Sequence, residues 1–353
     1  MHKIPSIFKN ESFDYKIKIP KQGEDISSFI SNCYAFKPKN LYLSEAKWKY
    51  LIRAVLRGDN ILMTGPSGTG KTVSAYSLHL VLKRPFFTFN MGSIGDDAKI
   101  SLIGNTHYEP STGTFFSESD FVQAITTPNS IVLLDELTRA NKQAWNILMS
   151  VLDKEQRYLR IDDRVNDRII RVADGVSFIA TANIGYQYTA TYQMDWALEN
   201  RFSIVEMDPI PLEDEIQFLS NQFPHVNVNV IRIICKIADD TRRGIASGTS
   251  MLEHDISTRM LIRFCELIND GFTFSEAIDT TIIPFYSSDG GNASERVYLK
   301  EIIQKHYIPA IDTLIHSKVI SLKKNKQQTN TSDDDTPAML FSSDEIDSLF
   351  SDT

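Results

Sequence analysis

The sequence has 353 residues, of which 42% are hydrophobic and 23% charged, a composition typical of a globular protein with one large or two modest domains. Its net charge of −8 argues against a general basic surface for nucleic acid. The three cysteines are scattered, without metal-site or disulfide spacing, which favours inert thiols in a reducing compartment. Because no apolar run reaches membrane-spanning length and the N-terminus has no signal-peptide core, we expect a cytoplasmic protein without membrane contact.

The first strong pattern along the chain is a helix over residues 44–58. Ser44 stands at the cap position, apolar residues follow on one face, and Gly58 ends the segment. Predicted strands and helices then alternate, with strands at 60–65, 85–91, 130–136, 176–183 and 201–208 and helices at 71–83 and 139–155. This alternation predicts an α/β fold whose parallel sheet is covered by helices on both faces.

After residues 209–211 the pattern is helical only, at 212–223, 230–244, 257–271 and 274–283. We therefore divide the chain into an N-terminal extension (1–40), an α/β domain (41–209), a helical domain (210–318) and a disordered acidic tail (319–353). Within the tail, Ile346, Leu349 and Phe350 form a short apolar motif that would fold onto a groove of another protein. A merely solubilising tail is the competing interpretation.

A phosphate-binding loop is predicted by "GPSGTGKT", a complete G-x-x-x-x-G-K-[ST] motif between a predicted strand and a predicted helix. Its glycines allow backbone N–H groups to surround phosphates, and the helix N-terminus adds its dipole. The lysine supplies a charge and the final threonine a hydroxyl for Mg²⁺, so ATP and Mg²⁺ are the expected cofactors. The expected nucleotide-binding residues are Gly65, Pro66, Ser67, Gly68, Thr69, Gly70, Lys71 and Thr72.

Two later strands end in polar residues where α/β sheets bind ligands. "IVLLDE" ends in Asp135, which we assign with Thr72 to Mg²⁺, and in Glu136, which would polarise the attacking water. "FIATAN" ends in Asn183, a neutral amide that would hold the same water. The competing interpretations are a solvated acidic turn for the first pair and an ordinary turn residue for the second.

Taken together, these motifs resemble the AAA+ ATPases. The order "GPSGTGKT", "IVLLDE", "IATAN", "ENRF" and "STRMLIRF" covers roughly residues 44–285. The narrower resemblance is to the MoxR-type branch, with the cobaltochelatase small subunit and dynein-related ATPases. "DELTRAN" is similar to a motif of that branch, although Thr138 stands where Asn is usual. Residues 102–125 resemble its helix-2 insert, and residues 156–181 its hairpin before sensor 1.

The resemblance implies an AAA+ P-loop NTPase fold with a helix-flanked parallel sheet, β-hairpin inserts and a C-terminal helical lid. In such proteins the hairpins lie near a central pore or on the ring face. Phe115 and Phe116 would then grip a client, whereas packing of both rings onto the domain is an equally good interpretation.

Three arginines acquire a meaning from this resemblance. Arg201, in "ENRF", matches the finger that reaches the γ-phosphate in a neighbouring subunit, and the sequence near it offers no acidic partner beyond Glu199. Arg139 is the second interface candidate, unless it pairs with Asp135 or Glu136. Arg259 matches the sensor 2 arginine of the lid, with a solvated helix charge as the alternative.

For the adjacent Arg242 and Arg243 a solvated face is the favoured interpretation. The resemblance implies an ATP-hydrolysing ring, a hexamer, that remodels a protein client with chaperone-type activity, together with a von Willebrand factor A-like partner.

Two other functions stay open. A DNA-directed motor or loader is suggested by the basic residues of the second hairpin and opposed by its acidic ones. The basic residues are Arg157, Arg160, Arg164, Arg168 and Arg171, and the acidic ones are Asp162, Asp163 and Asp167. A scaffold that binds ATP without turnover is opposed by the intact Lys71, Asp135, Glu136 and Arg201.

Overall fold

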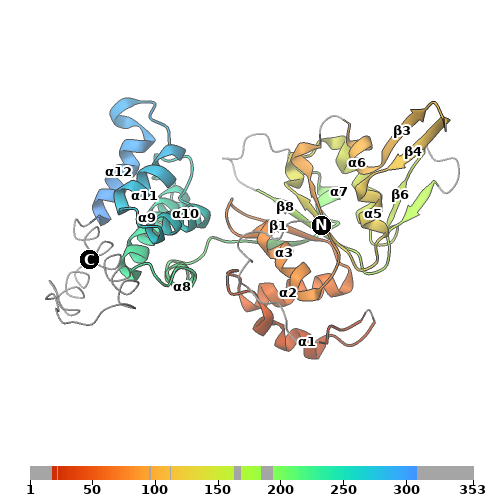
Figure 1. Ribbon diagram of the computed structural model, residues 1–353, viewed down its shortest axis with the longest axis horizontal. Helices are drawn as coiled ribbons and strands as arrows, with labels where there is room; N and C mark the ends of the chain where they lie inside the picture. Colours follow the sequence, from red (N-terminus) through yellow and green to blue (C-terminus); the bar gives the residue numbers. More distant parts are fainter. Residues whose placement is uncertain are drawn as a thin grey trace, which may run out of the picture.

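A five-stranded sheet forms the centre of the N-terminal part of the protein (Figure 1). The computed structural model describes residues 18–21, 23–94, 97–111, 113–162, 168–183 and 194–307. Every neighbouring pair of strands in this sheet is parallel, so the carboxyl ends of the strands meet at one edge. The strands, in order across the sheet, are β2 (Phe86–Asn90), β5 (Ile131–Asp135), β8 (Ser177–Ala182), β1 (Ile61–Thr64) and β9 (Ser203–Glu206). The predicted parallel sheet is thereby confirmed.

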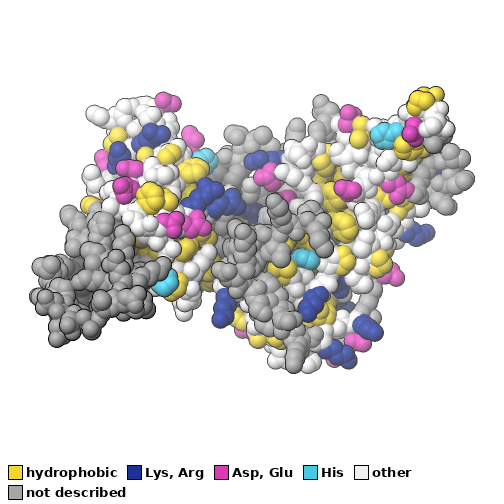
Figure 2. Space-filling view, in the orientation of Figure 1, with side chains coloured by type: hydrophobic (Ala, Val, Ile, Leu, Met, Phe, Trp, Pro, Cys, Tyr) yellow, Lys and Arg dark blue, Asp and Glu magenta, His cyan; other side chains and the backbone are white. Residues whose placement is uncertain are grey.

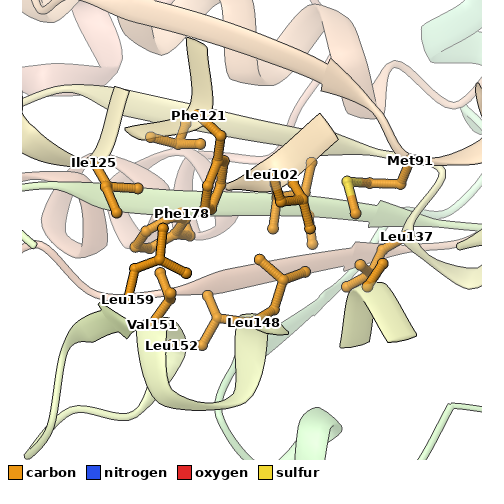
Figure 3. Packing of buried hydrophobic residues seen from close by; sticks show 14 of the residues in the cluster. Met91, Leu102, Phe121, Ile125, Leu137, Leu148, Val151, Leu152, Leu159 and Phe178 are labelled. Carbon is orange, nitrogen blue, oxygen red and sulfur yellow. The ribbon is translucent and has the colours of Figure 1, made fainter. Parts of the chain in front are cut away.

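Helices cover both faces of the sheet because successive side chains of a strand point to opposite sides. On one face, Ile61 and Met63 pack against the first two long helices, α2 (Glu45–Arg57) and α3 (Lys71–Leu82). On the other face, Phe178 packs with residues of three helices (Figure 3). Those helices are α4 (Ala98–Leu102), α5 (Asp120–Thr126) and α6 (Lys142–Leu152).

The helix predicted at 44–58 is confirmed as α2. The Ser44 hydroxyl accepts a hydrogen bond from the Lys47 N–H, and Gly58 ends the helix in the left-handed conformation with φ 68°. Before it, α1 (Ser27–Asn32) and the 3₁₀ turn η2 (Cys33–Phe36) pack on α2, and the Trp48 indole donates to the Cys33 carbonyl at 2.9 Å. The described residues before position 40 thus share the core of the sheet domain.

Two antiparallel hairpins project from the sheet domain, as the sequence predicts (Figure 1). The first joins β3 (Gly104–Glu109) to β4 (Gly113–Glu118), and the second joins β6 (Tyr158–Arg160) to β7 (Ile169–Arg171). Three short elements lie in the connections between the strands of the sheet domain. These are η3 (Met91–Ser93), η4 (Leu137–Arg139) and the single turn α7 (Trp196–Glu199).

The C-terminal part is helical and has a hydrophobic core of its own, centred on buried residues such as Leu261 and Phe264. Its helices are α8 (Leu212–Gln222), α9 (Val228–Ala246), α10 (Thr258–Asn269), α11 (Phe274–Thr281) and α12 (Glu295–His306), with the turns η5 (Ile283–Phe285) and η6 (Gly291–Ala293). The first four were predicted, and α12 is an addition. Among the described residues, no helix is both long and apolar enough to cross a membrane. The predicted tail lies outside the described residues.

Candidate functional site

The phosphate-binding loop follows β1 and is held closely by the strand beside it. Gly65 has φ 137°, and a Cβ added there would lie 2.2 Å from the Met207 carbonyl oxygen. The Met207 N–H in turn donates to the Thr64 carbonyl at 2.7 Å. Only glycine fits at position 65, because the backbone of Met207, directly after β9, lies against the start of the loop.

The loop ends where α3 begins, an arrangement suited to an anion. Gly70, the residue before the helix, has φ 86°. None of the described side chains caps α3, so the N–H groups of its first turn are available to a ligand. With the helix dipole, these N–H groups fit the phosphates of a nucleotide.

Lys71 lies at the base of this loop with a side chain that is almost entirely buried. The residue is 8% exposed, and its Nζ donates to the carbonyl oxygens of Gly65 at 2.8 Å and Pro66 at 2.7 Å. Burial lowers the pKa of Lys71 to about 8, against the opposing effect of the Asp135 carboxylate. Its charge is therefore poorly compensated in the free protein and suits an anionic ligand.

Thr72 and Asp135 provide adjacent oxygens at the carboxyl edge of the sheet. The Thr72 Oγ1 lies 3.1 Å from the Asp135 Oδ1. In the described parts of the chain, no three His, Cys, Asp or Glu side chains form a metal cluster. A hydroxyl beside one carboxylate fits Mg²⁺, which takes few protein ligands and completes its shell with water and nucleotide phosphates.

Glu136 follows Asp135 in an unusual backbone conformation, with φ 58° and ψ 44°. Thr181 on the neighbouring strand β8 ties the two acids together. Its hydroxyl donates to the Asp135 Oδ1 at 2.6 Å and accepts from the Glu136 N–H at 2.9 Å. A non-glycine residue in the left-handed region is strained, and such strain is often found at functional sites.

Arg139 contacts the side chain of Glu136. Its Nη1 lies 3.1 Å from the Glu136 Oε2, which favours the pairing interpretation of Arg139 in this conformation. Gly92, just after β2, borders this pair, because a Cβ added there would lie 3.1 Å from the Glu136 Oε2. The carboxylate predicted to polarise water is thus held at a defined position.

Asn183 follows β8 directly and is partly buried. In the register of the sheet, Leu134 pairs with Ala180, so Asn183 lies beyond the same edge as Glu136. The structure brings the predicted amide and the predicted acids to the same end of adjacent strands.

The lid reaches the phosphate-binding loop through the start of α10. A Cβ added to Gly68 would lie 3.0 Å from the Ser257 Cβ and 3.9 Å from the Arg259 Cβ. The Arg259 charge also helps to lower the pKa of Lys71, after burial. Figure 2 shows Lys and Arg side chains gathered where the lid meets the sheet domain. The structure therefore brings together the phosphate loop, Asp135, Glu136 and Arg259.

Comparisons with known proteins agree with this geometry. Residues 60–202 match the family described as AAA domain (dynein-related subfamily), and residues 215–306 match the CbbQ/NirQ/NorQ C-terminal domain. A protein of Staphylococcus epidermidis, named as uncharacterized, is 30% identical over 228 residues, 64% of this chain and 83% of that protein. The chain belongs to the MoxR-type AAA+ ATPases.

Two further similarities accompany that assignment. The candidate chaperone BssE of Thauera aromatica is 29% identical over 224 residues, which is 63% of this MoxR-type protein and 74% of BssE. Among solved structures, a mutant of Thermotoga maritima RuvB matches with a TM-score of 0.46 and 16% identity, covering 72% of this chain and 75% of that one.

In this MoxR-type protein, Arg201 lies at the amino edge of the sheet, opposite the edge that carries the phosphate loop. It precedes Ser203, which pairs with Ile61 at the start of β1. Its Nε donates to the Met149 carbonyl at 2.9 Å, and its Nη1 donates to the Ala197 carbonyl. Its Nη2 lies 3.3 Å from the Asp153 carboxylate. The sequence interpretation that found no acidic partner beyond Glu199 is thus corrected. The structure does not bring Arg201 to the phosphate loop of its own subunit.

Two other arginines make contacts that the sequence did not predict. Arg242 is 10% exposed and pairs with Glu215, so a solvated face is wrong for Arg242, although the side chain of Arg243 is largely exposed. The Arg157 guanidinium donates to the Gly58 carbonyl at 3.0 Å and the Val176 carbonyl at 2.7 Å. Neither arginine could be assigned from sequence, because their partners lie far away along the chain.

Proposed function

We propose that this MoxR-type protein hydrolyses ATP to ADP and phosphate in a ring of six subunits, and uses the energy to remodel a protein client. The observation that carries the proposal is the meeting of Lys71, Thr72, Asp135 and Glu136 at one edge of the sheet. The phosphate loop would be sufficient for binding a nucleotide. Activation of a water molecule for hydrolysis also needs a carboxylate beside the loop, the role given to Glu136.

The position of each site residue indicates which part of ATP binding or hydrolysis it would serve. The N–H groups of the loop and the Lys71 ammonium would hold the β- and γ-phosphates. Thr72 and Asp135 would hold Mg²⁺, which when bound neutralises phosphate charge. The Glu136 carboxylate would orient the water, supported by the Asn183 amide, and Arg259 would contact the phosphates from the lid. An arginine of the neighbouring subunit, Arg201, would stabilise the charge that develops in the transition state.

A protein client is supported by the first hairpin and by the similarity to the candidate chaperone BssE. On β3–β4, Tyr108 is 74% and Phe115 is 46% exposed, which leaves two aromatic side chains on a projecting element. Exposed aromatic groups of this kind are enriched at protein interfaces. A von Willebrand factor A-like partner and a cytoplasmic site of action complete the proposal by family resemblance.

The DNA-directed alternative gains no support from the second hairpin. Arg157 is occupied by backbone carbonyls, and the Arg160 Nε lies 2.7 Å from the Asp162 carboxylate. Residues 163–167, with further charges, lie outside the described part. Hydrolysis stimulated by DNA at low salt, and lost as salt rises, would favour this alternative over a protein client.

The test of hydrolysis is Glu136→Gln, which keeps the shape of the side chain and removes its negative charge. We expect ATP to bind as in the wild type while Mg²⁺-dependent phosphate release falls by about 100-fold or more. Glu266→Gln, on the exposed face of α10, is the matched control and should hydrolyse ATP normally. Unchanged turnover in Glu136→Gln would refute the catalytic role. The ATP-bound variant can then be used to capture the client.

A further inference from the structure

A buried ion pair in the lid has no part in the chemistry described above. Glu215, in the first turn of α8, is completely buried, and Arg242 of α9 donates to both of its oxygens, at 2.7 and 3.0 Å. Removing two charges from water is costly, and such a pair is seldom more stabilising than apolar residues of the same volume. We therefore expect the Glu215–Arg242 pair to have a role other than stabilising the fold.

The remaining hydrogen bonds of this cluster converge on residues 256–258, at the start of α10. The Arg242 guanidinium donates to the Ile256 carbonyl through Nε at 3.2 Å and Nη2 at 2.9 Å. The Thr258 hydroxyl donates to the Glu215 Oε1 at 2.6 Å, and the Ile256 N–H donates to the Thr241 Oγ1 at 3.1 Å. Helices α8 and α9 therefore fix residues 256–258 from both sides.

These fixed residues carry the part of the lid that touches the phosphate loop. Ser257 lies between Ile256 and Thr258, and its Cβ is 3.0 Å from where a Cβ on Gly68 would be. Arg259 follows Thr258 directly. A small displacement of Thr258 would therefore move both contacts relative to the loop.

The same cluster is joined to the connection between the two domains. The Glu215 N–H donates to the Pro211 carbonyl at 2.8 Å, and Pro211 ends the segment that leaves β9. We propose that Glu215, Arg242 and Thr258 are positioning residues, which hold Ser257 and Arg259 at the nucleotide and transmit movement of the interdomain connection to them. This inference rests on the proposed binding of ATP at the loop.

Thr258→Val tests the inference, because valine keeps the shape of threonine and removes the hydrogen bond to Glu215. We expect the Kd for ATP to rise about fivefold or more, while the protein stays folded at the temperature of measurement. Thr258→Ser, which keeps the hydroxyl, should restore most of the affinity. Thr281→Val is the matched control, because Thr281 is also a buried lid threonine and its hydroxyl donates to the Ala277 carbonyl at 2.6 Å, outside the cluster.

A second measurement separates positioning from general stability. In an Arg259→Ala background, Thr258→Val should change the Kd much less than in the wild type, because the contact on which Thr258 acts is already gone. An unchanged Kd for ATP in Thr258→Val, or an equal rise of the Kd in Thr258→Val and Thr281→Val, would overturn the inference. The proposed function would stand in either case, provided that the wild type binds ATP. A wild-type protein that binds no ATP would overturn both.

Discussion

The environment of Lys71 indicates an anionic ligand more clearly than that of any other site residue. Its side chain is buried beneath the loop, where two backbone carbonyls accept its hydrogen bonds and the Asp135 carboxylate only partly offsets the loss of water. The resulting pKa of about 8 means that the ammonium of the free protein loses its proton as the pH rises through that value. Nucleotide phosphates favour the charged form, so binding should draw the proton back.

Proton uptake on ATP binding follows from that pKa. At pH 8.5, in EDTA, we expect more than about half a proton to be taken up per site, because Lys71 is mostly neutral before binding and charged afterwards. The affinity for ATP should correspondingly weaken as the pH rises from 8 to 10. Calorimetric titrations in two buffers of different ionisation enthalpy measure the uptake. Binding heats that are the same in both buffers would contradict the predicted state of Lys71.

Arg201 has contacts in its own subunit that a finger acting on a neighbour does not explain. If the main role of Arg201 is to hold α7 to the end of α6, replacing its partner Asp153 should lower ATP hydrolysis as much as replacing Arg201 itself. If it acts on the neighbour's ATP, the two changes should differ. The pair of variants therefore separates the two roles.

Arg201→Ala should bind ATP nearly as the wild type does but hydrolyse it about 1000-fold more slowly, the range typical of an arginine finger. Asp153→Asn, which keeps an oxygen for the nearby N–H groups and removes the charge, should retain most of the hydrolysis. Steady-state phosphate release and thermal unfolding are measured for both. Equal losses of activity in the two variants would assign Arg201 to the structure of its own subunit.

Among single residues, the sequence predicted those that belong to a local motif and missed those defined by distant partners. Lys71, Thr72 and Asp135 lie in recognisable patterns and meet as predicted. Thr181 was missed because a threonine two positions before Asn183 fits an ordinary strand, and only the register with β5 places its hydroxyl between Asp135 and Glu136.

At the scale of elements, the first hairpin separates two adjacent aromatic residues. Phe115 pairs with His107 and Phe116 with Thr106, and neighbouring residues of a strand face opposite sides. Phe116 packs against the core of the sheet domain, whereas Phe115 is exposed. The sequence predicted the hairpin from its turn, but the orientation of each ring depends on how the hairpin meets the domain.

Phe116→Ala should therefore destabilise the protein by about 2 kcal/mol, less than for a fully buried phenylalanine. Phe115→Ala should change the free energy of unfolding by less than about 0.5 kcal/mol and leave basal ATP hydrolysis unchanged. Chemical denaturation of the two variants measures the difference. Equal destabilisation would show that both rings pack, and would remove Phe115 as a candidate client contact.

The helices show where periodicity is informative. The apolar face and the Ser44 cap were sufficient to predict α2, and helical spacing alone predicted α11, in which the structure shows a complete capping box formed by Thr273 and Glu276. The short α1 has no fully buried residue, and of α12 only Leu299 is buried. Such elements owe their place to tertiary packing more than to a pattern of their own.

At the scale of the whole molecule, the sheet domain and the helical lid form two bodies with separate cores (Figure 1). Besides the contact of Ser257 with the loop, the Tyr42 hydroxyl donates to the Asp214 carboxylate of the lid at 2.7 Å. Polar contacts of this kind can be exchanged at low cost, unlike an apolar interface. The arrangement suits a lid whose position responds to the nucleotide.

In the proposed ring, another subunit would supply half of the site, because Lys71 and Arg201 lie at opposite edges of one sheet. Mixing two inactive variants, Lys71→Ala and Arg201→Ala, and measuring ATP hydrolysis across a series of ratios tests whether one subunit completes the site of another. We expect mixtures to regain activity, with a maximum at intermediate ratios, since Arg201→Ala subunits bind ATP and Lys71→Ala subunits supply the arginine. Mixed assemblies that stay inactive at every ratio would contradict it.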